Sequence, residues 1–187
     1  MRTRDCEKQQ RIKEAIVNVI LREGINGASV AKIAREASVS PATIYIYYSN
    51  KEEMLAEVFK EYSHQSYHYL MKRMQPEMSG AELIETIIRG VFNYTVEHEE
   101  VFSFVEQCSR CPSLSETVCE TDCCCDVFEL IHRYQELGII RRCSDPNLSA
   151  VLFSPVRFLA MNSRSMHFDA EAELAELVKM MQEMLLL

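Results

Sequence analysis

The densest group of chemically reactive side chains is a run of cysteines in the second half of the chain. Six of the eight cysteines fall between positions 108 and 125, and four of them have a spacing that suits a tetrahedral soft metal: Cys108, Cys111, Cys119 and Cys123. The same thiols suit a redox-sensing disulfide. However, Cys119 and Cys123 also lie on a helical stripe that continues into Val127 and Ile131, as small core side chains do. We favour the core interpretation and expect no metal and no cofactor. The alternative is a thiol- or metal-responsive sensor that uses the Cys108–Cys125 cluster.

The histidines give little sign of catalysis. They are scattered over the chain, at His64, His68, His98, His132 and His167. The sequence contains no GxSxG, no HExxH and no phosphate-cradling loop. His64 and His68 are one helical turn apart, but tyrosines surround them and a solvated face explains them better than a shared metal. We therefore do not expect an enzyme.

A second group of polar and aromatic side chains lies between positions 29 and 51, and helices must position it. The preceding segment has the apolar spacing of one buried helical face, Ile12, Ala15, Ile16, Val19 and Ile20. Gly24 and Gly27 are expected to end that helix, because glycine adopts the left-handed conformation of a helix C-terminus without steric cost. A short helix follows, from Ser29 as N-cap to about Glu36.

The next helix begins after a tight turn. Residues 37–39 form the turn, Ser40 is the expected N-cap, and Pro41 occupies the first helical position. After about six residues the pattern breaks near Ser49, and a long amphipathic helix begins at about residue 50. Two short helices joined by a three-residue turn and braced by longer helices on either side have the geometry of a helix-turn-helix.

These residues carry a family resemblance. The stretch SVAKIAREASVSPATIYIYYSNKEEMLAEVF resembles the DNA-binding segment of the TetR family of bacterial transcriptional regulators. The resemblance covers about residues 10–60 by motif and the remainder by length and all-helical plan. Ser38 is a departure, since the family usually has glycine in the turn. Serine can replace glycine there if its φ is negative, or in the left-handed conformation at a modest cost.

The resemblance implies a set of DNA-binding residues, which are Ser29, Lys32, Ser40, Pro41, Ala42, Thr43, Tyr45, Tyr47, Tyr48 and Lys51. In this hypothesis Ser29, Lys32 and Lys51 bind phosphates. Tyr45 and Tyr47 donate hydroxyl hydrogen bonds to the DNA backbone. Residues 40–43 meet base edges, where methyl groups suit thymine. Tyr48 corresponds to an aromatic residue that packs more often than it touches DNA.

Helical spacing continues to the end of the chain, and no alternating strand pattern interrupts it. The fourth helix is expected at about 50–74, and a capping box at Ser79 and Glu82 opens the next. The sequence thus predicts an all-α protein of about nine helices. We expect a helix-turn-helix domain at 1–54 and a helical effector-binding and dimerisation domain at 55–187, linked by the fourth helix.

The charge is divided along the chain in a way that fits this plan. The net charge of −8 is made up of +3 in residues 1–50 and −11 in the remainder. A basic end on an acidic body suggests two functions in one chain. No apolar run approaches the ~18 residues that span a bilayer, and the N-terminal residues lack the apolar core of a secretory signal. We expect a cytoplasmic protein with no membrane partner.

A two-fold dimer would present two short recognition helices to successive major grooves, about 34 Å apart or somewhat more. The resemblance implies that the last two helices, at about 145–163 and 169–187, form this interface. Apolar stripes in both helices support it, and Pro155 predicts a kink in the first.

The resemblance also implies an effector pocket among the middle helices. Aromatic residues are the candidate lining, namely Tyr62, Tyr69, Phe92, Phe102, Phe104, Phe128 and Tyr134. The hypothesis is therefore a dimeric repressor that a small molecule releases from palindromic, double-stranded operator DNA. The sequence leaves open the effector, the operator, the target genes and the choice between repressor and activator.

Overall fold

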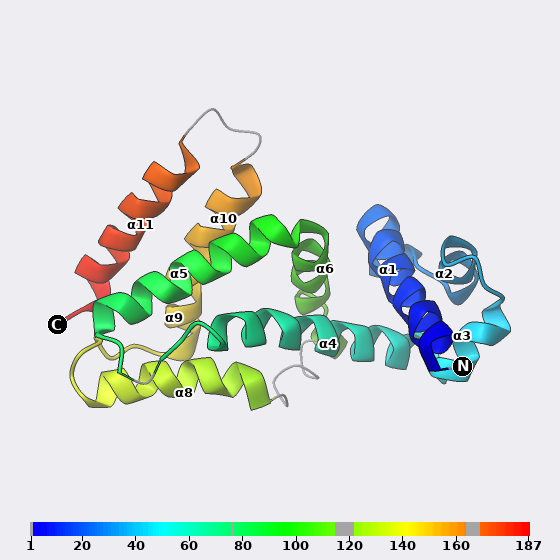
Figure 1. Cartoon of the computed structure of the whole chain (residues 1–187), viewed down its shortest axis with the longest axis horizontal. Coiled ribbons are helices and arrows are strands. Elements are labelled where there is room, and N and C mark those ends of the chain that lie inside the picture. The colour runs from blue at the N-terminus through cyan, green and yellow to red at the C-terminus, as the bar shows by residue number, and fades with distance from the viewer. Residues whose placement is uncertain (1, 76, 115–121, 164–168) are drawn as a thin grey trace. The chain divides into compact units, whose positions relative to one another are not determined.

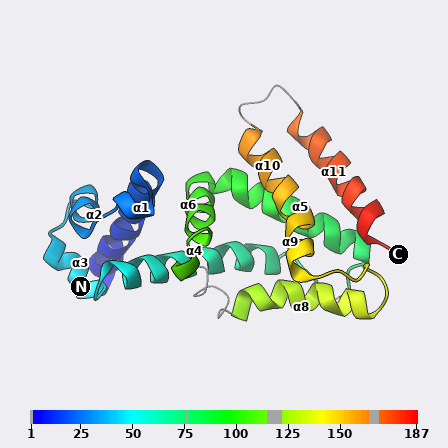
Figure 2. The same cartoon turned by 180° about the vertical axis from the view of Figure 1, so that it is seen from behind.

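The chain is all-α, as predicted. The computed structural model describes residues 2–75, 77–114, 122–163 and 169–187, with the side chains of all of these except 2–4 and 122–126. The helices in these ranges number ten (Figures 1 and 2): α1 (Arg2–Gly27), α2 (Val30–Glu36), α3 (Pro41–Tyr47), α4 (Lys51–Met71), α5 (Gly80–Glu97), α6 (Glu99–Ser109), α8 (Asp122–Glu136), α9 (Asp145–Leu152), α10 (Ser154–Asn162) and α11 (Ala170–Leu185).

The helices form two compact units. The first unit contains residues 1–63 and 100–121, and the second contains residues 64–99 and 122–187. Each has its own apolar core. The division proposed for function, at 1–54 and 55–187, stays a prediction.

The core of the first unit is built from the stripe that the sequence predicted on α1. Ile12, Ile16 and Ile20 are all fully buried, and Ile33 of α2 and Ile44 of α3 join the same cluster. Helix α2 contacts both α1 and α3. The two short helices bury one large side chain each, so α1 and the start of α4 must supply the remaining apolar surface.

The end of α1 is set by a glycine. The backbone of Gly24 has φ 75° and ψ 167°, which interrupts the helix before a last turn that runs to Gly27. An L side chain adopts this conformation only at a cost. The predicted stop at Gly24 and Gly27 is thus present as an interruption at Gly24 and the helix end at Gly27, although the ψ of Gly24 differs from that of the expected left-handed helical conformation.

In the second unit α5 packs against α10 and α11, and α10 also contacts α9 and α11. The predicted capping box opens α5, because the backbone N–H of Glu82 donates to Ser79 Oγ at 3.2 Å and that of Ser79 donates to Glu82 Oε2 at 2.7 Å. The predicted cap of the last helix is also present, with Asp169 accepting from the N–H groups of Glu171 and Ala172.

The helix expected at 145–163 is wrong in one respect, because the structure has two helices there. Helix α9 ends at Leu152 and α10 begins at Ser154, with Phe153 between them. Pro155 has no N–H to donate to the carbonyl four residues earlier, and its ring clashes with that carbonyl. A break, rather than a kink, places Pro155 in the first turn of a new helix, where its missing N–H costs nothing.

In the described ranges, β-type pairing of backbone is limited to one antiparallel bridge, between Ile140 and Leu186. No described helix has the length and apolar character needed to cross a bilayer.

Candidate DNA-binding interface

The turn between α2 and α3 has a left-handed residue at its centre. Ser38 has φ 54°. Its N–H donates to Arg35 O at 3.2 Å, and the N–H of Val39 donates to Ala34 O at 2.9 Å. These two bonds close α2 in a Schellman motif, whose left-handed position is usually glycine. Serine thus holds the turn geometry at a conformational cost.

Helix α3 starts as the sequence predicted. Ser40 is its N-cap, accepting from the N–H of Thr43 at 3.2 Å, and Pro41 follows. The Ser40 and Thr43 hydroxyl oxygens are also 2.9 Å apart and hydrogen-bonded. Ile44 and Tyr48, at 1% and 2% exposure, anchor this seven-residue helix and the residue after it to the core.

The opposite face of α3 is exposed. Ala42, Tyr45 and Ile46 follow the i, i+3, i+4 spacing of one helical face, and Tyr45 is 55% exposed. Ile46 is 78% exposed, and sequence reasoning missed it as a candidate for DNA contact. Its spacing from Ala42 was the signal that places it on this face.

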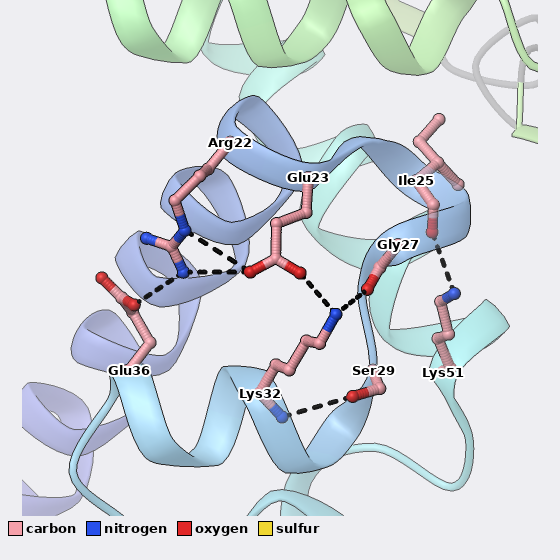
Figure 3. Close-up of polar contacts among 8 residues, drawn as sticks. All are labelled: Arg22, Glu23, Ile25, Gly27, Ser29, Lys32, Glu36 and Lys51. Carbon is pink, nitrogen blue, oxygen red and sulfur yellow. Dashed lines mark hydrogen bonds and ion pairs between the residues drawn. The ribbon is translucent and has the colours of Figure 1, made fainter.

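Both lysines assigned to phosphate contacts donate to carbonyls at the end of α1, and their phosphate contacts stay a prediction (Figure 3). Lys51 Nζ donates to Ile25 O at 2.9 Å, and Lys32 Nζ donates to Gly27 O at 2.8 Å. These carbonyls belong to the last turn of α1, after the Gly24 interruption, where acceptors lack helical partners. The lysines therefore hold α2 and α4 to α1.

Lys32 also belongs to a charged network on the first two helices. Its Nζ is 2.5 Å from Glu23 Oε2, while Arg22 Nη2 is 3.4 Å from Glu23 Oε1 and 3.0 Å from Glu36 Oε2 (Figure 3). The Lys32 ammonium lowers the pKa of Glu23, mainly by donating a hydrogen bond to it. Glu23 thus stays ionised and offsets much of the Lys32 charge.

The ten predicted contacts fall into three classes of exposure. Four are exposed, Ser40, Pro41, Ala42 and Tyr45, and five are half-buried, Ser29, Lys32, Thr43, Tyr47 and Lys51. Ser29 is the N-cap of α2 and accepts from the Lys32 N–H at 3.3 Å. Tyr48 is in the core, and burial raises the pKa of its hydroxyl to about 12. We therefore treat Tyr48 as a packing residue rather than a DNA contact.

The cysteine cluster is only partly within the described residues. Cys108 is fully buried in the core of the first unit, and burial raises the pKa of its thiol to about 12. Cys111 is half-buried and lies 3.2 Å from the Ser113 hydroxyl. Cys119 and the side chain of Cys123 lie outside the description. Among the described residues no three metal-binding side chains come together.

The aromatic residues assigned to an effector pocket are divided between the two units. Tyr62, Phe102 and Phe104 belong to the first, and Tyr69, Phe92, Phe128 and Tyr134 to the second. Tyr62 and Phe104 are buried and pack edge to face. In the second unit Phe92 and Phe128 are only half-buried. The pocket stays a prediction.

The family described as bacterial regulatory proteins, tetR family, matches residues 12–58, from the first buried isoleucine of α1 into α4. An uncharacterised helix-turn-helix transcriptional regulator of Haemophilus influenzae is 24% identical over 95% of both chains. A fatty acid metabolism regulator of Bacillus subtilis is 33% identical over 46% of this chain and 44% of its own.

Solved structures extend the likeness to the whole chain. A TetR family regulator from Marinobacter aquaeolei superimposes with a TM-score of 0.85 over 100% of this chain and 99% of its own, at 24% identity. FadR of Bacillus subtilis, solved in complex with stearoyl-CoA, has a TM-score of 0.72 over 92% of this chain and 97% of its own, at 21% identity. The chain belongs to the TetR family, and it is a DNA-binding transcriptional regulator rather than an enzyme.

Proposed function

We propose that this regulator is a dimeric repressor that a small-molecule effector releases from palindromic operator DNA. The observation that carries the proposal is the exposed face of α3. Ser40 caps this helix, and a Schellman motif closes α2 before it, so that the helix-turn-helix presents this face to solvent. A recognition helix needs such a face to enter the major groove.

In this proposal the residues of α3 divide the work of DNA recognition. Pro41 and Ala42 meet base edges through apolar contacts, and the Ser40 and Thr43 hydroxyls lie beside them at the helix N-terminus. Tyr45 and Tyr47 donate to phosphates, and Ser29 binds a phosphate at the start of α2. Lys32 and Lys51 serve the fold first. Because an ammonium has three N–H donors, each lysine can also donate to a phosphate.

The dimer in this proposal uses α10 and α11. Large apolar side chains are exposed on both helices, Phe158 at 63%, Met161 at 41%, Met180 at 53% and Met184 at 44%. The two helices contact each other, and exposed apolar side chains are of the kind that an interface covers. Phe158→Glu is expected to give a monomer in sedimentation equilibrium. The control Leu137→Glu changes an equally exposed apolar residue, at 64%, outside these helices. A dimer that survives Phe158→Glu contradicts this interface.

The effector in this proposal binds in the second unit. Phe92 and Phe128 are half-buried, so an apolar ligand can reach part of each ring, and Met71 and Met74 beside the same core adapt easily in shape. Because FadR of Bacillus subtilis is solved with stearoyl-CoA, a long-chain acyl-CoA is the first probe. A ligand releases DNA only through its differential affinity for two conformations.

The test starts with the purified protein and fragments of its source genome. Selection at two salt concentrations should enrich a palindromic site, with affinity that falls as salt rises. Transcription in vitro from that site should fall when protein is added and recover with the effector. Failure to enrich any site in reduced, metal-free and metal-loaded samples alike would contradict DNA binding. Enrichment in only one of these states would instead support the thiol- or metal-responsive sensor.

A further inference from the structure

The first turn of α1 lies beside the end of α3, and the two are joined by a hydrogen bond. The Tyr47 hydroxyl donates to Asp5 Oδ1, across 42 positions in the sequence. Both views show the N-terminus next to α3 (Figures 1 and 2). Asp5 is exposed and precedes the family-matched segment, which starts at residue 12.

This bond uses the hydrogen that Tyr47 needs for DNA. A phenol has one O–H, and a phosphate oxygen is an acceptor that requires that donor. The bond to Asp5 also raises the pKa of Tyr47, so the hydroxyl stays protonated and held. Tyr47 can donate to a phosphate only after it leaves Asp5.

The negative charge of Asp5 also opposes DNA binding. Helix α3 itself contains no charged residue, since it reads PATIYIY. The Asp5 carboxylate therefore places a negative charge next to an uncharged reading helix. DNA phosphates are repelled by such a charge, and this repulsion applies to every sequence alike.

We propose that Asp5 restrains DNA binding by holding the Tyr47 hydroxyl and opposing the phosphate backbone, which lowers affinity for non-specific DNA. The inference rests on the proposed DNA binding. It makes Asp5 a positioning residue that acts through Tyr47, with its effect largest where base contacts do not compensate.

The experiment measures binding of the full chain to a random-sequence duplex over a salt series. Asp5→Asn removes the charge but keeps an oxygen that accepts from Tyr47, whereas Asp5→Ala removes both. Affinity should rise about threefold for Asp5→Asn and further for Asp5→Ala, with a steeper salt dependence for both. Circular dichroism melts confirm that the variants remain folded.

Tyr47→Phe separates the two parts of the effect. In the Tyr47→Phe protein, Asp5→Ala and Asp5→Asn should raise the affinity for the random duplex equally, because both still remove the carboxylate charge. Glu7→Gln is the matched charge control. Glu7 is an exposed acid of α1, and because successive helical residues are rotated by about 100°, it lies on nearly the opposite side of the helix from Asp5. Its gain should be clearly smaller.

Three results would overturn the proposal: no gain for Asp5→Asn and Asp5→Ala, weaker binding by either, or an equal gain for Glu7→Gln. If the wild-type protein binds neither the random duplex nor any selected site, the proposed function itself has failed, which is a separate outcome.

Discussion

The ammonium of Lys51, at the first position of α4, donates a 2.9 Å hydrogen bond to the carbonyl of Ile25, in the last turn of α1. The bond is half-buried and joins residues 26 positions apart. It satisfies a carbonyl that lies beyond the Gly24 interruption. Lys51 therefore joins α1 to α4, in addition to its proposed contact with a DNA phosphate.

Lys51→Met should lower the free energy of unfolding by about 1 kcal/mol, because it leaves the Ile25 carbonyl without a charged donor. Denaturant unfolding followed by circular dichroism measures the loss. Lys60→Met, an exposed lysine on the same helix, is the control and should change stability little. Equal stability of the two variants would show that the bond from Lys51 to Ile25 does not stabilise the protein.

Ser38→Gly should stabilise the protein. Ser38 holds φ 54°, which costs an L residue about 1–2 kcal/mol. Glycine relieves that strain but has more freedom in the unfolded chain, so the net gain should be about 0.5–1 kcal/mol. Ala37→Gly, at φ −73° in the same turn, should instead lose about 1 kcal/mol. A destabilised Ser38→Gly variant would mean that the serine side chain compensates for the strain.

Ile46→Ser should weaken binding to the selected operator about tenfold, since an exposed isoleucine of this face would bury its apolar surface on thymine methyls or sugars. Its salt dependence should stay unchanged, because no charge is lost. Leu137→Ser, another highly exposed apolar residue, serves as the control. Unaltered operator affinity would remove Ile46 from the interface.

Cys108 should make stability fall with alkaline pH. Its thiol has a pKa raised by burial to about 12, against 9.0 as the ordinary value. Between these values the unfolded chain releases a proton that the folded chain keeps, so each pH unit costs about 1.4 kcal/mol. The contribution is fully present below pH 9 and is lost as pH rises towards 12.

Unfolding of the wild type and of Cys108→Ala between pH 8.5 and 10 tests this linkage. The variant loses stability at every pH through its cavity, but its slope with pH should be shallower. Because the pKa values of Tyr48 and Tyr62 are also raised, the comparison is one of slopes and not of absolute stability. Parallel slopes for wild type and Cys108→Ala would contradict a buried, protonated thiol.

The sequence alone determined the features that depend on neighbours within one helical turn. The caps at Ser29, Ser40 and Asp169 bond to N–H groups two or three residues away, and the stripe of α1 repeats with the helical period. Such patterns are local, so residue type and spacing are enough to predict them. The all-α class and the helix-turn-helix follow from the same kind of pattern.

Only the tertiary structure decided how distant groups are used. Lys51 and Lys32 are cations that a linear pattern assigns to phosphates, yet they bind carbonyls of α1. Tyr47 meets Asp5, and Cys108 enters a core with Tyr62 and Phe104, because α1 and α6 fold against distant segments. Hydrogen-bond partners and burial depend on which surfaces meet in three dimensions, and residue spacing does not contain that information.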